Sequence, residues 1–275
     1  MTAHVNDMTG KVAVITGGAS GIGLAMARAF GVAGARLMLA DIEATALAEA
    51  IGALAGEGCE VDGIVCDVSK WADVEALAER TYERFGAANV ICNNAGVVTF
   101  KPTWEQTLDD WDWVLGVDLM GVVHGIRAFV PRMIASGEVG HIVNTASVAG
   151  LLGFPAIAPY VAAKMAVVGV SESLHNDLLA AGHSIGVSVL CPGGVRTRIR
   201  ESERNRPGFE DAPTDGLTME SKEAINPEDV ASLVLDAVRA GTFWILPHER
   251  YVDMFVRRAD SARARIDPPI PTVDR

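Results

Sequence analysis

The sequence predicts an α/β fold, in which a doubly wound parallel sheet of seven strands carries helices on both faces. Three observations predict it. Short β-branched runs alternate strictly with longer helical patterns. The runs near the middle of the chain are apolar almost throughout, as parallel strands buried on both faces are. The 275 residues are 49% hydrophobic, which is enough for the large core of a single domain spanning residues 1–275.

Seven segments are predicted as strands because each is short, apolar and rich in valine, isoleucine or leucine. In chain order they are Val12–Thr16, Arg36–Ala40, Val61–Cys66, Val90–Asn93, His141–Thr145, Ile185–Cys191 and Phe243–Leu246. Six segments between them carry the longer spacing of helices. These are Ile22–Ala33, Ala44–Ala55, Trp71–Phe85, Trp111–Ser136, Tyr160–Ala180 and Pro227–Ala240.

Charge and composition exclude several classes of partner. The net charge of −12 argues against nucleic acid or an anionic membrane, because both need a basic patch on the protein. The four cysteines show no C-x-x-C pairing and the histidines no ligand spacing, so we expect buried thiols and no metal. The polar start of the chain lacks the apolar core of a signal peptide, which favours a soluble, cytoplasmic protein.

Two segments near the C-terminus fall outside the regular pattern. Residues 196–225 are dense in charged residues, proline and glycine, and fit either a surface loop or a substrate lid. Their place after the C-terminal end of a strand, where ligands bind in such sheets, favours the lid. The arginine-rich segment from Val252, with a tail from about residue 266, is expected either to contact a neighbouring subunit or to be solvated.

A glycine-rich turn joins the first strand to the first helix. Its sequence is Thr16-Gly17-Gly18-Ala19-Ser20-Gly21-Ile22-Gly23. A helix N-terminus offers free N–H groups and partial positive charge, and glycines let a diphosphate approach the backbone. Asp41 follows at the end of the second strand, where a carboxylate can accept hydrogen bonds from the adenosine ribose. The pattern predicts a dinucleotide site of the Rossmann type.

Asp41 favours NAD over NADP as the cofactor. A carboxylate about 4 Å from the extra phosphate of NADP repels it by roughly 4 kcal/mol per charge at an effective dielectric near 20. The positions considered for a compensating cation hold Ala19 and Ile42, which are uncharged. A role for Asp41 as a helix N-cap is compatible with ribose binding but does not explain its spacing from the glycine turn.

Ser147, Tyr160 and Lys164 are the candidate catalytic residues. Tyr160 and Lys164 are four apart and project from one face of a helix, and Ser147 ends a strand thirteen residues earlier. A phenol, an ammonium and a hydroxyl can move a proton to or from an alcohol oxygen. The pKa of tyrosine is about 10, whereas a base that works near neutral pH needs a pKa nearer to about 7. Lowering the pKa that far takes about 3–4 kcal/mol of interaction that favours the phenolate. Lys164 and an oxidised nicotinamide are the expected sources.

The sequence resembles the short-chain dehydrogenase/reductase family over nearly its whole length. The motifs that carry the resemblance are Thr16-Gly17-x-x-x-Gly21-x-Gly23, Cys66-Asp67-Val68, Asn93-Asn94-Ala95-Gly96 and Pro192-Gly193-Gly194-Val195-Arg196-Thr197, together with the catalytic trio. The resemblance implies that Ser147 orients the substrate oxygen, that Tyr160 is the base, and that Lys164 also grips the nicotinamide ribose. It implies cofactor contacts from Gly17, Ser20, Gly21, Ile22, Gly23, Asp41, Ile42, Asp67, Val68, Asn94, Ala95, Gly96, Tyr160, Lys164, Pro192, Gly193, Val195 and Thr197.

One departure from the family pattern concerns a fourth catalytic position. The family usually has asparagine at the end of W-D-x-x-x-x-V-N, where it shapes a helix distortion and holds a water, whereas here the pattern from Trp111 ends in Asp118. The charge of Asp118 is expected to pair with Lys164 and to weaken the pull of Lys164 on Tyr160. A tolerated substitution without kinetic effect is the alternative.

An apolar segment after Ser147 suggests a hydrophobic substrate pocket. The residues proposed to line it are Val148, Leu151, Leu152, Phe154 and Ile157, with Val98, Trp104, Phe209, Leu217 and Met219. These residues predict a secondary alcohol or ketone on an apolar or aromatic frame, although the same segment could simply pack onto the protein. Long helices apolar on more than one face predict a homotetramer or dimer.

The sequence therefore predicts a hydride-transferring oxidoreductase that uses NAD. Two alternatives stay open at this point. One is an NAD-binding redox sensor or scaffold without turnover, which the intact trio disfavours. The other is a dehydratase or epimerase on the same fold. The natural substrate, the direction of reaction and the stereospecificity are not encoded in any motif that we recognise.

Overall fold

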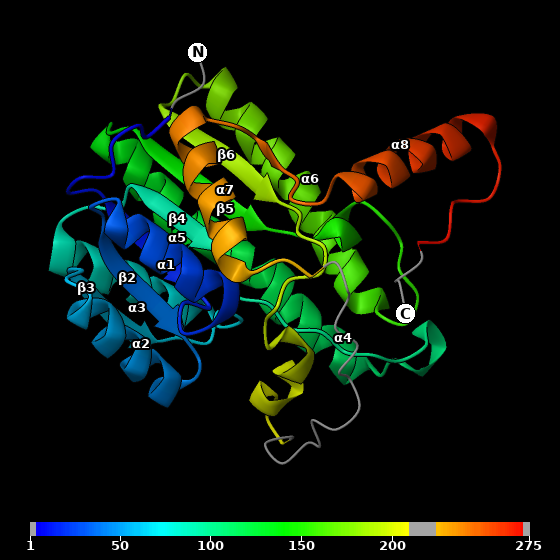
Figure 1. Cartoon of the computed structure of the whole chain (residues 1–275), viewed down its shortest axis with the longest axis horizontal. Coiled ribbons are helices and arrows are strands. Elements are labelled where there is room, and N and C mark those ends of the chain that lie inside the picture. The colour runs from blue at the N-terminus through cyan, green and yellow to red at the C-terminus, as the bar shows by residue number, and fades with distance from the viewer. Residues whose placement is uncertain (1–3, 209–223, 272–275) are drawn as a thin grey trace.

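A seven-stranded parallel sheet in the order β3-β2-β1-β4-β5-β6-β7 organises the chain, as the sequence predicts. The computed structural model describes residues 4–208 and 224–271 (Figure 1). The strands are β1 (Val12–Thr16), β2 (Arg36–Asp41), β3 (Val61–Val65), β4 (Val90–Asn93), β5 (Gly140–Thr145), β6 (Ile185–Leu190) and β7 (Trp244–Ile245). Each lies within two residues of its predicted bounds.

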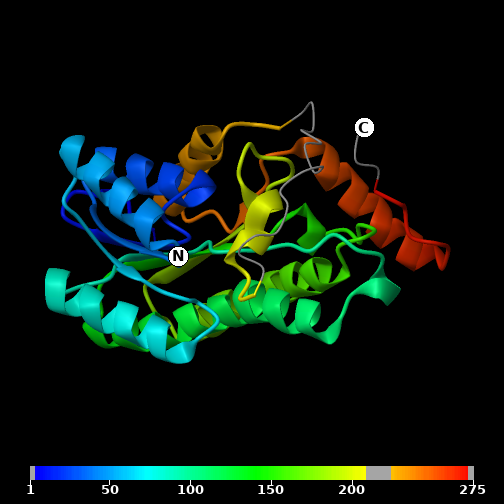
Figure 2. The same cartoon turned by 90° about the horizontal axis from the view of Figure 1, so that it is seen from below.

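Helices cover both faces of the sheet, which gives three layers (Figure 2). One face carries α1 (Gly21–Val32), α2 (Ala44–Gly56) and α7 (Pro227–Ala240). The other carries α3 (Trp71–Phe85), α5 (Gly121–Ser136) and α6 (Ala158–Ala180). Right-handed crossovers between parallel strands produce this arrangement, because the order in which strands are added to the sheet reverses between β1 and β4.

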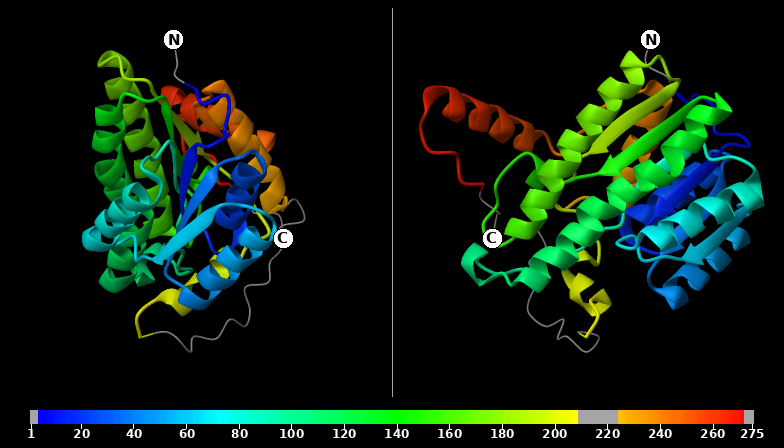
Figure 3. Two further views of the ribbon diagram at one scale, coloured as in Figure 1. Left: turned by 90° about the vertical axis from the view of Figure 1, so that its left-hand side faces the viewer. Right: turned by 180° about the vertical axis from the view of Figure 1, so that it is seen from behind.

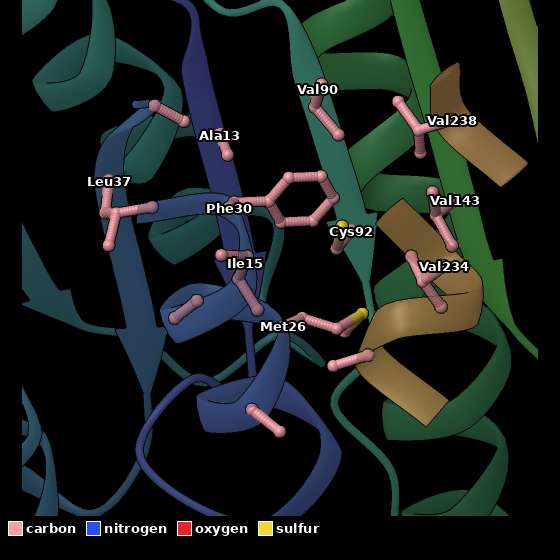
Figure 4. Close-up of a cluster of buried hydrophobic side chains, with 14 of the residues drawn as sticks. Ala13, Ile15, Met26, Phe30, Leu37, Val90, Cys92, Val143, Val234 and Val238 are labelled. Carbon is pink, nitrogen blue, oxygen red and sulfur yellow. The ribbon is translucent and has the colours of Figure 1, made fainter. Parts of the chain in front are cut away.

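A core of large apolar side chains joins the sheet to the first helical layer (Figure 4). Met26 and Phe30 of α1 are fully buried against β1 and β4, and Val234 of α7 faces them. Burying a side chain of this size stabilises a fold by about 1.5–3 kcal/mol. The contacts fix the position of the N-terminus of α1, where the glycine turn lies.

The segment predicted as one helix over Trp111–Ser136 is interrupted by a π-helical turn. It comprises α4 (Leu108–Leu115), the π turn η2 (Gly116–Met120) and α5. Such turns carry one extra residue and are frequent at functional sites. By length and composition alone, the continuous run Leu108–Ser136 could cross a membrane, but it packs on α3, α6 and β4 as core helices of soluble folds also do.

A helix that the sequence analysis missed follows β7. It is α8 (Glu249–Ala264), which projects from the body of the molecule in the right-hand view of Figure 3. Its first turns are anchored because Tyr251 is buried and lies against Phe154, while Arg258 Nη1 donates to the Leu151 carbonyl at 2.9 Å. The segment from Val252 is therefore a packed helix in its first half, where a solvated tail or a contact with another subunit was expected.

Candidate active site

A cleft of about 420 Å³ opens at the C-terminal edge of the sheet, above the point where the strand order reverses. This is where open α/β sheets bind their ligands. The cleft is lined by all the predicted cofactor residues except Gly23, and by Ser147. The structure therefore brings predicted residues from seven separate segments to one place. Asp118 and Gly23 lie directly behind its wall.

The glycine turn has the backbone that the sequence predicts. Gly17 and Gly21 have φ of +63° and +51°, which favour glycine. A Cβ on Gly23 would lie 2.0 Å from the Gly17 carbonyl oxygen, so the third glycine is needed for close packing of helix on turn. Thr16 joins this turn to β4, since its Oγ1 accepts from the backbone N–H groups of Asn94 and Ala95 at 2.9 and 3.1 Å. The start of α1 is thus preformed for a diphosphate.

At the far end of the cleft Asp41 is held by two backbone N–H groups. Its Oδ2 accepts from Ala19 at 3.0 Å and its Oδ1 from Glu43 at 3.0 Å. Each oxygen keeps a second lone pair for a ribose hydroxyl. The possible N-cap role is not seen, because Glu43 occupies the N-cap position of α2. Asp67 lies nearby, and its Oδ1 accepts from the Ser69 hydroxyl at 2.6 Å.

Ser147, Tyr160 and Lys164 meet at the opposite end of the cleft, as predicted. Ser147 follows β5, and its hydroxyl is near enough to Tyr160 to lower the pKa of that phenol; the same hydroxyl donates to the Pro192 carbonyl at 3.3 Å. Tyr160 and Lys164 lie one turn apart on α6, with Lys164 Nζ 5.4 Å from the centre of the Tyr160 ring. Lys164 is 2% exposed and donates to the Thr145 carbonyl at 3.0 Å. Backbone contacts therefore hold both the serine and the lysine in place.

Asp118 forms the predicted ion pair with Lys164. The π turn directs its carboxylate inwards, where Oδ2 lies 3.2 Å from Lys164 Nζ and Oδ1 accepts from the Val97 N–H at 2.7 Å. Both side chains are buried. A buried charge of this kind is tolerated because it is paired and hydrogen-bonded.

The charges around Tyr160 act in opposite directions on its pKa. Burial raises the pKa of the Tyr160 phenol above its ordinary value, Lys164 and the Ser147 hydroxyl lower it, and Asp118 raises it. Burial lowers the pKa of the Lys164 ammonium, but Asp118 and Tyr160 outweigh this effect and raise it overall. Lys164 thus stays charged. The protein's own charges do not, however, lower the pKa of Tyr160 towards neutral pH, as the sequence analysis expected of Lys164. Asp118 is one reason.

The predicted apolar wall of the cleft is wrong in its residues. Val148, Leu151 and Leu152 are buried in a core with α8, which confirms the alternative that this segment packs onto the protein. Trp104 is 85% exposed and does not line the cleft. Phe209, Leu217 and Met219 lie outside the described residues. The apolar lining comes instead from Trp113 and Val117 near the π turn, and from Val97, Ile199 and Pro207.

A strap, defined here as residues 197–206, crosses the cleft and supplies residues that the sequence analysis missed. It contains the short helix η4 (Ile199–Asn205), drawn in yellow in Figure 1. Ser202 Oγ accepts from the Val98 N–H at 2.9 Å, Arg206 binds the buried carboxylate of Asp110, and Arg204 binds Glu43. These partners lie about 100 to 160 residues earlier in the chain, so local spacing carries no signal for them.

The sheet order and the preformed cleft define a dinucleotide-binding α/β protein. Comparison with known proteins makes this more specific. The family model described as short chain dehydrogenase matches residues 11–208. The chain belongs to the short-chain dehydrogenase/reductase family, as the resemblance implied. It is therefore an oxidoreductase that uses a nicotinamide dinucleotide and acts on a small molecule.

Named relatives and solved structures cover most of the chain. The C alpha-dehydrogenase of Sphingobium sp. strain SYK-6 is 37% identical over 253 residues, which are 89% of this chain and 82% of that protein. The 1-deoxy-11-beta-hydroxypentalenate dehydrogenase of Streptomyces avermitilis is 37% identical over 86% of this chain and 83% of its own. A family member from Burkholderia phymatum in complex with NAD superposes with a TM-score of 0.90 at 39% identity, covering 98% and 99% of the two chains.

Proposed function

We propose that this protein is an NAD-dependent dehydrogenase or reductase that interconverts a secondary alcohol and a ketone on an apolar or aromatic frame. The observation that carries the proposal is the meeting of Ser147, Tyr160 and Lys164 at one end of the dinucleotide cleft. A nicotinamide bound in the cleft would supply the hydride acceptor for the alcohol carbon, or the hydride donor for the ketone. The chain itself must position the substrate and move the proton.

The proposed proton path runs through Tyr160. Its phenolate takes the hydroxyl proton during oxidation and the phenol returns it during reduction. The Ser147 hydroxyl holds the substrate oxygen, and its own position is fixed by the Ala149 N–H, which donates to it at 3.1 Å. Lys164 stabilises the phenolate by its charge and, lining the cleft, would also hold the nicotinamide ribose as the family pattern implies. Asp118 acts through Lys164 and is a positioning residue.

The preference for NAD is supported by the carboxylates at the ribose end. Asp41 lines the cleft with a free lone pair on each oxygen, and Glu43 lies two residues further on. Gly17, Ser20, Gly21 and Ile22 would hold the diphosphate at the start of α1. The other predicted cofactor residues that line the cleft, among them Asp67, Val68, Asn94, Pro192 and Thr197, are assigned the contacts that the family pattern implies.

The preference for an apolar frame is supported by the side chains beyond Tyr160. Trp113, Val117 and Ile199 supply most of the apolar lining at this end. The strap holds Trp113 in place through a cation–π contact, in which the Arg206 guanidinium lies 5.4 Å from the centre of the Trp113 ring. We propose residues 196–225 as the substrate lid within a single domain, of which residues 209–223 lie outside the described part of the chain.

Nicotinamide reduction over a panel of secondary alcohols tests the proposal, with Tyr160→Phe as the diagnostic variant. We expect Tyr160→Phe to lower kcat/KM about 1000-fold, within the usual contribution of a general acid-base group. Tyr82→Phe is the matched control, because Tyr82 lies on α3 away from the cleft. A wild type that binds dinucleotide but reduces none of it supports the sensor or scaffold alternative. Substrate conversion without net change in nicotinamide supports the dehydratase or epimerase.

The homo-oligomer and the cytoplasmic location stay predictions. Leu179 on α6, at 55% exposure, is compatible with a further subunit. Size-exclusion chromatography with light scattering measures the oligomeric state, and a monomer at micromolar concentration would contradict the prediction.

A further inference from the structure

The strap brings two guanidinium groups to the ribose end of the cleft. Arg198 and Arg204 both line the cleft together with Asp41 and Glu43. Positive charge at this place matters, because the extra phosphate of NADP is attached to the adenosine ribose. Ala19 and Ile42, the neighbouring positions considered for a compensating cation, are uncharged. The strap supplies two cations that do not belong to the neighbouring sequence.

Glu43 forms an ion pair with Arg204, the nearer of these two guanidinium groups. Its Oε1 accepts from Arg204 Nη2, and from Asn205 Nδ2 at 3.2 Å, while Oε2 lies 4.0 Å from Arg198 Nη1. Arg198 has a second partner in Glu201, at 3.0 Å on its own segment. Glu43 is also linked to Asp41, to which its backbone N–H donates at 3.0 Å. The carboxylate that neutralises Arg204 therefore stands beside the predicted ribose ligand.

Arg204 is held in place independently of Glu43. Its Nη1 donates to the carbonyls of Glu201 at 2.8 Å and Arg198 at 3.3 Å, within its own segment. Its Nε is buried and has no acceptor among the residues that the structure describes. A guanidinium fixed on one side and with donors left over suits a phosphate, which it can bind through two parallel hydrogen bonds.

We propose that Glu43 is a specificity-determining residue that excludes NADP by occupying Arg204. The inference rests on the proposed NAD preference and adds a second cause to it. Asp41 repels the ribose phosphate directly, and Glu43 both repels it and removes the cation that would bind it. Replacing Glu43 by glutamine keeps the shape and the hydrogen bond with Asn205 while leaving the charge of Arg204 unneutralised.

The test measures dinucleotide binding and needs no turnover. Fluorescence titration with NADH and NADPH gives a Kd for each in the wild type, Glu43→Gln, Glu43→Gln/Arg204→Gln and Glu49→Gln. Glu43→Gln is expected to bind NADPH about tenfold more tightly, which corresponds to about 1.4 kcal/mol, because a negative charge is removed and the charge of Arg204 is freed for the phosphate. NADH should change less than about twofold.

The further variants decide the cause. The gain should disappear in Glu43→Gln/Arg204→Gln, because the cation is gone. Glu49→Gln changes the net charge equally at an exposed site on α2 and should bind both dinucleotides as the wild type does. An unchanged NADPH Kd in Glu43→Gln, or an equal change for both dinucleotides, overturns the inference. A wild type that binds NADPH as tightly as NADH overturns the proposed NAD preference itself.

Discussion

At the scale of single residues, Asp118 opposes the effect of Lys164 on the pKa of Tyr160. With a neutral asparagine at this position, the charge of Lys164 would act on Tyr160 without being offset by residue 118. The Asp118 carboxylate, 3.2 Å from the Lys164 ammonium, offsets part of that charge. In a water-poor site such charges interact strongly over several ångströms. Burial and Asp118 both raise the pKa of Tyr160, and Lys164 lowers it. The chain thus has a base that is harder to deprotonate than an asparagine at this position would give.

Asp118→Asn is expected to move the acidic limb of kcat/KM for alcohol oxidation to lower pH. The base must be deprotonated to accept a proton, so activity rises with pH through its pKa, and removing the neighbouring negative charge lowers that pKa. A pH–rate profile of both proteins measures the shift. Asp112→Asn, at an exposed position on α4, serves as the control. A limb that stays in place would support the alternative of a tolerated substitution without kinetic effect. A limb that moves to higher pH would contradict the expected effect of Asp118.

At the scale of elements, the start of α4 is the point where the strap is fastened to the substrate side of the cleft. Thr107 and Asp110 form a capping box, in which the Thr107 Oγ1 accepts from the Asp110 N–H at 3.1 Å. The same Asp110 carboxylate is fully buried and binds Lys101 at 2.8 Å and Arg206 of the strap. One carboxylate therefore caps a helix and anchors the segment that covers the cleft.

Asp110→Asn is expected to destabilise the protein by about 3 kcal/mol near pH 7, because it removes the buried negative charge that Lys101 and Arg206 share. Burial raises the pKa of Asp110, but Lys101, Thr107 and Arg206 outweigh it and hold the pKa well below its usual range. A carboxyl with a lowered folded-state pKa stabilises above its unfolded pKa of about 3.9, and the effect is lost as pH falls through the folded value. Urea unfolding between pH 7 and pH 3 should show the gap to wild type narrowing. Asp109→Asn, exposed beside it, should cost less than about 0.5 kcal/mol.

For the whole molecule, local patterns predicted the sheet and the cleft but not what covers them. The strands followed from their apolar runs, and Gly17, Asp41 and Tyr160 from fixed spacings along single segments. The contacts of Arg204 with Glu43 and of Arg206 with Asp110 depend on how the strap folds back across the sheet. Each joins residues with unrelated surroundings in sequence, so neither spacing nor composition could indicate them.

Helix α8 shows a different kind of miss, because its signal was present. Tyr251, Met254, Phe255 and Arg258 stand at the i, i+3, i+4 and i+7 spacing of one helix face. The high charge of the segment concealed this pattern. The first three side chains pack into the core that also takes up Leu151 and Leu152, which is why those leucines are absent from the cleft. A missed helix and a misplaced substrate wall thus have one physical cause.

Binding of the dinucleotide should stabilise the whole fold, because the cleft joins segments from both halves of the sheet. A ligand at 100 times its Kd adds about 2.7 kcal/mol to the free energy of unfolding, which corresponds to roughly 5–10 °C in melting temperature for a chain of this size. We expect NAD to produce this shift and NADP a smaller one at equal concentration. Differential scanning fluorimetry measures both.

Gly23→Ala should abolish the NAD shift, because its Cβ would meet the Gly17 carbonyl at 2.0 Å and displace the turn that receives the diphosphate. Gly52→Ala on α2 is the control, because its Cβ would meet no described atom within 4 Å. This variant should gain up to about 1 kcal/mol in the free energy of unfolding and keep the NAD-induced rise in melting temperature. If Gly23→Ala melted lower but kept the full response to NAD, the turn would matter for folding alone. The diphosphate would then have to bind elsewhere in the cleft.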